Sequence, residues 1–302
     1  MAGSERPFAL DAPLGPWRAL DGWVAGYALL TLGVAGLGAL RGVPGCPAQA
    51  AVSLRILGVA LGMAWLTRNT ASRVLLVLRL FYAPLLYWSF YHQVQFLWPV
   101  WWSAPLDRLL AALEERVWGF QPALAFRAAL PHRWLSELFC FAYFAYYTFV
   151  PVLGLTVLVR RGYRAAERII RSVTILFFTC YTFFWLAPTV GPHYWFPPGR
   201  GPELAQGYVF NHLLFFLTSG GEIRGAAFPS SHLAVALLLT LHARRAAPAL
   251  FPAMAVITAL MVPAVVYLRA HYALDVPAGL LAGWAAYLAS RPAQDERPSL
   301  AV

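Results

Sequence analysis

Eight apolar stretches, separated by more polar segments, are the feature that most constrains this chain of 302 residues. A helix needs about 20 predominantly apolar residues to cross the hydrocarbon core of a bilayer. The second and the sixth stretch are short by this measure. The stretches are Trp23–Leu40, Val52–Leu66, Val74–Leu97, Leu135–Val159, Ile169–Ala187, Ser231–Leu241 with its preceding turn, Leu250–Leu268 and Tyr272–Ala289. The pattern predicts an all-α, polytopic membrane protein with about eight transmembrane helices.

The composition excludes an ordinary soluble domain, because 60% of the residues are hydrophobic and only 12% are charged. The formal charge is +10, and all 23 basic residues are arginines. In a membrane protein such an excess indicates cytoplasmic loops, and we expect no nucleic-acid partner. The three cysteines, Cys46, Cys140 and Cys180, are scattered along the chain, so we expect buried free thiols.

The arginines predict the orientation of the spans. Five of them fall between Arg160 and Arg171, and two further junctions are marked by Arg244–Arg245 and by Arg68 with Arg73. By the positive-inside rule these junctions are cytoplasmic, as both chain ends then are. The turn around His271 would lie on the exoplasmic side. We therefore expect an integral protein of a bacterial plasma membrane, with no cleavable signal peptide.

The same pattern divides the chain into segments. We expect a cytoplasmic tail (1–21), two additional N-terminal spans (22–70), a six-span core (71–290) and a second cytoplasmic tail (291–302). Within the core, residues 100–133 would form an interfacial helix region and residues 188–230 an exoplasmic loop.

A short amphipathic segment lies between the third and the fourth span. From Leu106 to Trp118, leucines recur three and four residues apart with charges between them, and Gly119 follows. Four tryptophans, Trp98, Trp101, Trp102 and Trp118, accompany it. This pattern predicts an interfacial amphipathic helix at the lipid headgroups. A helix packed on the protein surface without a lipid role is the open alternative.

A few ionisable residues fall inside or near the ends of the spans. Arg55 and Arg79 lie close to basic ends, and we expect their side chains to snorkel to the interface. His92 and Glu137 lie near exoplasmic ends, where they could help to line a cavity.

The segment Phe228–His232 has the composition of a helix start, with a proline and two serines before an apolar run. The N-terminus of that helix would face the exoplasmic side. Its unpaired backbone amides and the positive end of its dipole would favour an anion. His232 lies in the first turn, where it could protonate a leaving oxygen.

A second segment, Arg269–Asp275, carries a histidine and an aspartate four residues apart. On a helix, His271 and Asp275 would share one face. The carboxylate could then accept a hydrogen bond from one ring nitrogen and leave the other free to attack. Interfacial or capping histidines are one alternative, and a metal site that adds Glu222 to His232, His271 and Asp275 is another.

These two segments resemble the type 2 phosphatidic acid phosphatase superfamily, whose second motif reads Pro-Ser-Gly-His and whose third ends His-x-x-x-Asp. Here Pro229–His232 has a serine in place of the glycine, and His271–Asp275 matches the third motif. The resemblance covers the last six spans. Phe228, the Tyr267-Leu268 approach and the segment from Leu106 to Pro122 look like the branch of inositol phosphorylceramide synthases and their bacterial relatives.

The resemblance implies a role for each residue. His271 would be the nucleophile that forms a phosphohistidine, with Asp275 orienting it and His232 acting as general acid. Ser230 and the backbone amides of Ser231 and His232 would hold phosphate oxygens. Neither a metal nor another cofactor would be needed.

Two departures from the family pattern affect the phosphate site. Val265 occupies the position where the hydrolases of the family carry an arginine, and the lysine of the first motif is absent. A transferred phosphate still needs cationic or multiple donors. We expect them among Arg200, Arg224, Arg269 and His193, which all lie on the exoplasmic side in the predicted topology.

The expected activity is transfer of a phosphoryl or phosphoalcohol group from a membrane lipid. With water as acceptor the substrate would be a lipid phosphate or an isoprenyl diphosphate. With inositol or another polyol as acceptor the enzyme would be a head-group transferase, which the missing arginine favours. A non-catalytic lipid-binding or transport protein that retains the fold is the alternative.

Overall fold

The computed structural model describes residues 15, 17–70, 72–196, 207–218 and 223–290. Within these residues every regular element is a helix, so the all-α prediction is confirmed. Arg200 and Glu222 lie outside the described residues. So do the tail 291–302 and most of the tail 1–21.

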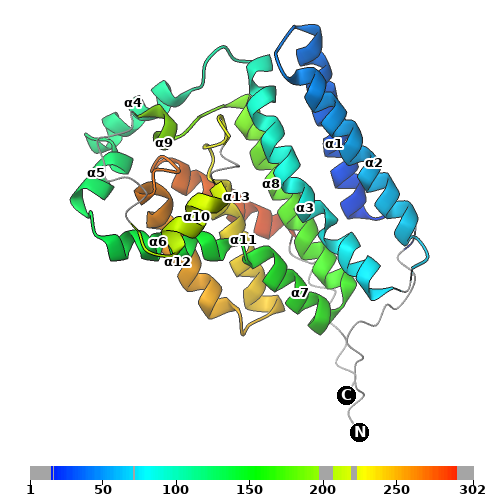
Figure 1. Ribbon diagram of the computed structural model, residues 1–302. Coiled ribbons are helices and arrows are strands. Elements are labelled where there is room, and N and C mark those ends of the chain that lie inside the picture. Colours follow the sequence, from blue (N-terminus) through cyan, green and yellow to red (C-terminus); the bar gives the residue numbers. More distant parts are fainter. Residues whose placement is uncertain (1–14, 16, 71, 197–206, 219–222, 291–302) are drawn as a thin grey trace.

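Three long helices stand at one edge of the molecule (Figure 1). α1 (Ala19–Leu40) and α2 (Cys46–Thr67) form a hairpin beside α3 (Arg73–Leu97), and both α1 and α3 pack on α8 (Tyr163–Leu186). The second apolar stretch is therefore longer than its hydropathy indicated, because α2 has 22 residues and starts at Cys46. All three cysteines are buried free thiols, as predicted.

The centre of the core is α11 (Ser231–Ala246), which contacts α8, α12 (Phe251–Tyr267) and α13 (Asp275–Ser290). Its residues from Leu233 to Ala236 are fully buried, so this helix is enclosed on all sides. Two glycines of α13 allow close backbone approach. A Cβ added at Gly279 would lie 2.5 Å from the carbonyl oxygen of Ser230, and one at Gly283 2.3 Å from that of Ala234.

The fourth expected span, Leu135–Val159, is bent rather than continuous. α6 (Arg133–Tyr146) and α7 (Phe149–Arg161) meet at an angle of 43°. Tyr147 and Thr148 separate them, and the Thr148 hydroxyl donates to the carbonyl of Ala145 at 2.7 Å. The backbone amide of Thr148 donates to the same carbonyl at 3.0 Å, so this carbonyl has two donors at the break.

The described residues form helices at all eight expected positions, but only some of these helices are long. Four are long and apolar enough to cross a membrane, and the bent pair makes a fifth. α11, α12 and α13 have 16, 17 and 16 residues. At about 1.5 Å per residue they rise by about 24–26 Å, less than the hydrocarbon thickness of about 30 Å. The chain is a multi-pass membrane protein in which the helices around the centre are short.

Short elements gather at one end of the bundle (Figure 1). They are η1 (Trp98–Val100), α4 (Asp107–Trp118), α5 (Pro122–Ala129), α9 (Pro192–Trp195) and α10 (Phe210–Thr218). At the opposite end of α7 and α11, the Arg161 guanidinium donates to the carbonyl of Arg245 at 2.6 Å. Two of the basic junctions that the sequence assigns to one side of the membrane are therefore in contact.

The expectation that Arg79 snorkels is wrong. Its side chain is 1% exposed, and it donates to the Asp21 carboxylate at 2.5 Å and to the Thr67 hydroxyl at 2.7 Å. Asp21 lies in α1, which begins at Ala19, and not in a tail. Arg55 is exposed and donates only within its own helix, to the carbonyl of Ala51.

Candidate active site

The segment Phe228–His232 leads into the start of α11, as the sequence predicts. Ser230 is the N-cap residue, and its hydroxyl accepts a hydrogen bond from the amide of Leu233 at 3.4 Å. The helix begins at Ser231, so His232 lies in its first turn. Ser230 is fully buried, whereas Ser231 contributes to the wall of a cavity described below.

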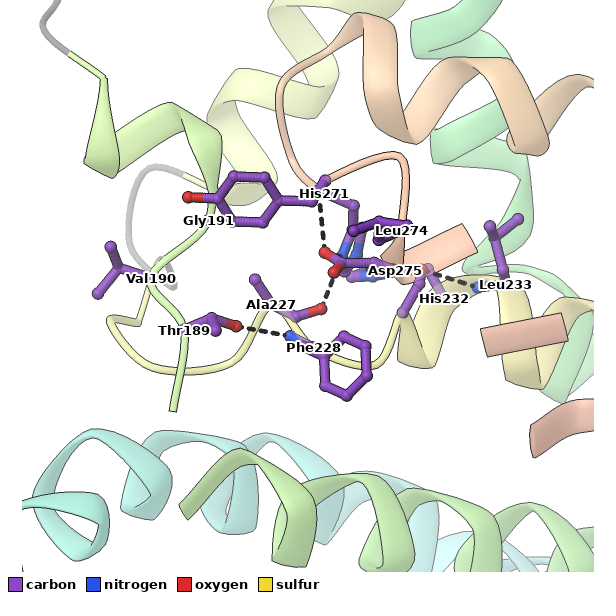
Figure 2. A network of polar contacts seen from close by, with 12 residues as sticks. Thr189, Val190, Gly191, Ala227, Phe228, His232, Leu233, His271, Leu274 and Asp275 are labelled. Carbon is purple, nitrogen blue, oxygen red and sulfur yellow. Dashed lines mark hydrogen bonds and ion pairs between the residues drawn. The ribbon is translucent and has the colours of Figure 1, made fainter. Parts of the chain in front are cut away.

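The segment from His271 to Asp275 is a turn that leads into α13 and not part of a longer helix. α13 begins only at Asp275, so His271 and Asp275 do not share a helix face as predicted. They meet nevertheless, because the turn brings His271 Nδ1 to 3.1 Å from Asp275 Oδ2 (Figure 2). Arg269, with a φ of 61°, reverses the chain just before this turn.

The hydrogen bonds of His271 determine which ring nitrogen is available. Nδ1 lies 2.8 Å from the carbonyl oxygen of Ala227 and 3.1 Å from Asp275 Oδ2, and both oxygens are acceptors. Nδ1 therefore carries the hydrogen, and Nε2 of the neutral ring keeps its lone pair. Figure 2 shows the three residues close together at the start of α11.

The two histidines are in direct contact. His271 Nε2 lies 3.3 Å from His232 Nδ1, and the other nitrogen of His232 lies 3.0 Å from the hydroxyl of Tyr143 on α6. No feature of the sequence singles out Tyr143, which lies in an aromatic run inside an expected span. Its position against His232 depends on how α6 packs and not on any local motif.

The histidine pair opens onto a cavity of about 710 Å³. Its walls are mainly apolar and rich in aromatic side chains, most of which come from α3, α6 and α8. The cavity extends to Leu85 and Trp88 on α3, whose side chains are 71% and 52% exposed. The aromatic wall residues are Phe81, Tyr87, Trp88, Tyr91, Tyr143, Tyr146, Tyr147, Phe177, Tyr181 and Tyr194. One polar end and one lipid-facing end fit an amphiphilic ligand.

Three of the four expected phosphate-binding residues are described, and all three lie around α9. The Arg269 guanidinium donates to the carbonyls of Pro192 and Phe196 at 3.2 and 3.4 Å, and burial lowers the pKa of Arg269. Arg224 is exposed and lies over the ring of Tyr194 at 5.8 Å. Among the three of these residues that the structure describes, only His193 lines the cavity. Arg200 is not described.

Val265, at the position of the family's hydrolase arginine, is fully buried. Its carbonyl accepts a hydrogen bond from the amide of His271 at 3.0 Å. The backbone at this position therefore supports the turn, while the side chain contributes no charge.

Two carboxylates of α4 reach the site region. Asp107 and Glu114 are fully buried, and desolvation raises the pKa of both carboxyl groups. The apolar side faces outward, since Leu109 and Val117 are 65% and 55% exposed. This outward apolar side suits an interfacial helix.

Glu137 and His92 are not among the described residues that line the cavity, although the sequence placed them near it. The Glu137 carboxylate accepts hydrogen bonds from the amides of Tyr208 to Asn211 at 2.5–3.2 Å and so caps the start of α10. His92 packs against the ring of Trp88, with 4.4 Å between the ring centroids.

Comparison with known families decides the relationship. A family model for the PAP2 superfamily matches residues 108–289, which is more than half of the chain and contains both motifs. The chain belongs to the PAP2 superfamily. Neither the comparison with curated proteins nor that with solved structures gives a significant match.

Membership confirms the resemblance to type 2 phosphatidic acid phosphatases at the level of the superfamily. PAP2 proteins are phosphatases and phosphotransferases, so membership supports an enzyme of this general type that acts on lipid phosphates in the membrane. The match runs from the first turn of α4 to the last turn of α13. The amphipathic helix is therefore part of the family region.

Proposed function

We propose that this PAP2 protein transfers a phosphoryl or phosphoalcohol group from a lipid through a phosphohistidine on His271. One observation carries the proposal. Nδ1 of His271 is held by two oxygen acceptors, while Nε2 faces His232 at the polar end of a cavity. A nucleophile whose second nitrogen is fixed by a carboxylate, with an acid within reach, is the arrangement that covalent phosphoryl transfer requires.

The reaction has two steps that use the same three side chains. In the first, Nε2 of His271 bonds to phosphorus, the bond to the leaving oxygen breaks, and protonated His232 gives its proton to that oxygen. In the second, the acceptor hydroxyl attacks phosphorus, its proton passes to His232, and the bond to His271 breaks. Asp275 holds the Nδ1 proton throughout.

The phosphate itself would lie at the N-terminus of α11. The backbone amides of Ser231 and His232 belong to the first turn, where the helix dipole favours an anion. His193, which lines the cavity, would add a donor. Ser230 caps the helix with its hydroxyl, so we assign it to holding the helix start. Arg200, Arg224 and Arg269 stay candidates for residues that supply positive charge near the polar end of the cavity.

The aromatic part of the cavity would hold the hydrocarbon chain of the substrate. Its wall runs from Tyr143 beside His232 to Leu85 and Trp88. Because those two side chains are exposed on a helix long enough to span the membrane, the chain would enter sideways from the bilayer.

We place the site on the exoplasmic face of a bacterial plasma membrane, with both chain ends in the cytoplasm. The contact between Arg161 and Arg245 supports this orientation, since two basic junctions meet at the end of α11 that is away from His232. Impermeant labelling of single cysteines introduced at positions 224 and 161 tests it. Labelling of both from the same side would overturn the orientation.

For the acceptor we favour the hydroxyl of inositol or another polyol. The support is the buried Val265, which replaces the arginine that the superfamily's hydrolases carry. With water as acceptor, the same intermediate would instead make the protein a phosphatase for a lipid phosphate or an isoprenyl diphosphate.

The test is a substrate panel with rapid quench. The purified protein in detergent is given phosphatidic acid, an isoprenyl diphosphate, or a phospholipid with inositol, each labelled at the phosphorus that is transferred. We expect acid-labile label on the protein and product in the inositol arm. Product in the other arms without inositol would establish the hydrolase, and lipid binding with neither label nor product would establish a non-catalytic protein.

A further inference from the structure

The amphipathic helix α4 turns two carboxylates toward the protein. Asp107 and Glu114 are seven residues apart, which is about two helical turns, so their side chains lie on the same side of α4. Both are fully buried. Burying a carboxylate costs free energy unless its oxygens accept hydrogen bonds. The donors that Asp107 and Glu114 contact therefore indicate the role of these two residues.

Asp107 binds two segments that are far apart in the sequence. Oδ2 accepts from the amide of Val190 at 2.7 Å, and Oδ1 accepts from the amide of Gly191 and the hydroxyl of Tyr272, both at 2.9 Å. Glu114 accepts from the amide of Leu274 at 3.1 Å through Oε1. The turn that follows His271 is therefore held by α4 at two points.

Tyr272 connects Asp107 to the catalytic pair. Its hydroxyl donates to Asp107, and its backbone amide donates to Asp275 Oδ2 at 2.9 Å. That oxygen is the one that contacts Nδ1 of His271. One residue thus separates the α4 carboxylate from the carboxylate that orients the proposed nucleophile.

The segment after α8 is held in the same way. Val190 and Gly191, which donate to Asp107, follow Thr189, whose hydroxyl accepts from the amide of Phe228 at 2.9 Å (Figure 2). Phe228 follows Ala227, whose carbonyl accepts from His271. The second oxygen partner of His271 is therefore tied to Asp107 through this segment.

We propose that Asp107 and Glu114 are positioning residues that hold the turn 271–275 and the segment 189–191 in the geometry in which His271 presents Nε2 to the cavity. The inference rests on the proposed function for the role of His271. α4 would then be a working part of the site.

The contacts of Asp107 require a carboxylate and not merely a polar group. Every partner of Asp107 is a donor, namely two amides and one hydroxyl. An asparagine keeps the size of the side chain but turns an NH2 group toward one of these donors, which leaves that donor unpaired in a buried place. Asp107→Asn is therefore the smallest change that disturbs the contacts of Asp107. At Glu114 the oxygen itself must be removed, as in Glu114→Ala, because a glutamine could still accept from the amide of Leu274.

The first test is kinetic. For Asp107→Asn we expect kcat to fall by about 10- to 100-fold, the loss that a shift of about 1 Å at a nucleophile produces. KM should change little, because the cavity walls stay in place. Glu114→Ala, which removes the acceptor of the Leu274 amide, should show a smaller loss, because a single contact is lost. Arg108→Gln, which removes an exposed charge from the same helix, is the matched control and should keep the kcat of the parent protein.

A double-mutant cycle separates positioning from general damage. Tyr272→Phe removes only the hydroxyl that donates to Asp107. If Asp107 acts through Tyr272, the kcat losses of Asp107→Asn and Tyr272→Phe combine to less than their product. Losses that multiply fully would overturn the connection through Tyr272.

A measurement that needs no substrate keeps this inference apart from the proposed function. Amide hydrogen exchange of the full-length protein should become faster at 189–191 and 272–274 in Asp107→Asn, with α1 and α2 unchanged. Unchanged exchange in these segments overturns the proposal, and so does faster exchange with an unaltered kcat. Absence of turnover in the parent protein would instead refute the proposed function. The exchange result would then still show whether Asp107 holds the segments 189–191 and 272–274 in place.

Discussion

Two buried polar networks lie at opposite ends of α8, and they differ in what their groups face. Near its start, Asp21 accepts from Arg79, from the hydroxyl of Tyr82 at 2.8 Å and from the amide of Arg18 at 2.9 Å. Near its end, the ring of His271 has two acceptors on Nδ1 and only His232 at Nε2. The first network pairs opposite charges among closely packed helices, while the second faces a cavity.

A structural network differs from a reactive one in the partners of its buried polar groups. Burying a charge is tolerated when it is paired and hydrogen-bonded, and such a pair then holds helices together. At the Asp21 end the ion pair joins α1 to α3, and Glu167 of α8 is bonded to Arg18 next to it. A lone pair that faces a cavity contributes nothing to packing, which is the reason to look for chemistry there.

The largest effect is expected for the nucleophile. His271→Ala should lower turnover by about 10³-fold or more, because loss of a covalent nucleophile removes the pathway itself. The same variant should take up no phosphorus label in rapid quench. Measured turnover near that of the parent protein, with the variant folded by size-exclusion chromatography, would contradict the assignment and with it the contrast between the two networks.

The general acid should come next. His232→Ala is expected to lose about 10²- to 10³-fold with a natural lipid, whose alkoxide is a poor leaving group. An aryl phosphate lipid analogue, whose leaving group needs no proton, should recover most of that loss. Equal losses on both substrates would assign His232 to binding rather than to acid catalysis.

A smaller effect is expected at the contact between α11 and α13. Gly279→Ala would place a methyl group 2.5 Å from the carbonyl of Ser230, so the helices that carry His232 and Asp275 must move apart. We expect about a tenfold loss of turnover and a lower melting temperature, since overpacking costs about 1–3 kcal/mol. Gly33→Ala on α1 is the control, because nothing lies within 4 Å of its added Cβ. If both variants behave alike, close packing does not set the site geometry.

What could be predicted from the sequence was local. Apolar runs gave the helices, and the helix-start composition before His232 gave the position of that residue. The spacing of His271 and Asp275 gave their contact, although a turn and not a helix face makes it. In each case the residues that interact lie within a few positions of one another.

What could not be predicted depends on partners far along the chain. Asp107 meets Val190 and Tyr272, which are 83 and 165 residues away, and Asp21 meets Arg79 across 58 residues. A carboxylate beside leucines has the pattern of an ordinary amphipathic helix whichever side it turns to the protein. Only the packing of α4 on the turn 271–275 decides that its acidic side faces inward.

The smallest effect on turnover is expected at the Asp21 end, and it is the sharpest test of the comparison. Asp21→Leu leaves the Arg79 charge buried and unpaired, which should destabilise the protein by about 3–5 kcal/mol. Turnover per folded molecule should stay unchanged, because α1 and α3 do not touch His271 or Asp275 through this pair.

The double variant Asp21→Leu with Arg79→Met removes both charges and should regain most of the lost stability, since an apolar replacement of a buried pair is often neutral or stabilising. Thermal melting in detergent and turnover corrected for folded protein measure the two quantities. Loss of turnover in the restabilised double variant would mean that the two networks are coupled along α8. The ion pair would then belong to the catalytic machinery, and the pairing of opposite charges would no longer mark a network as purely structural.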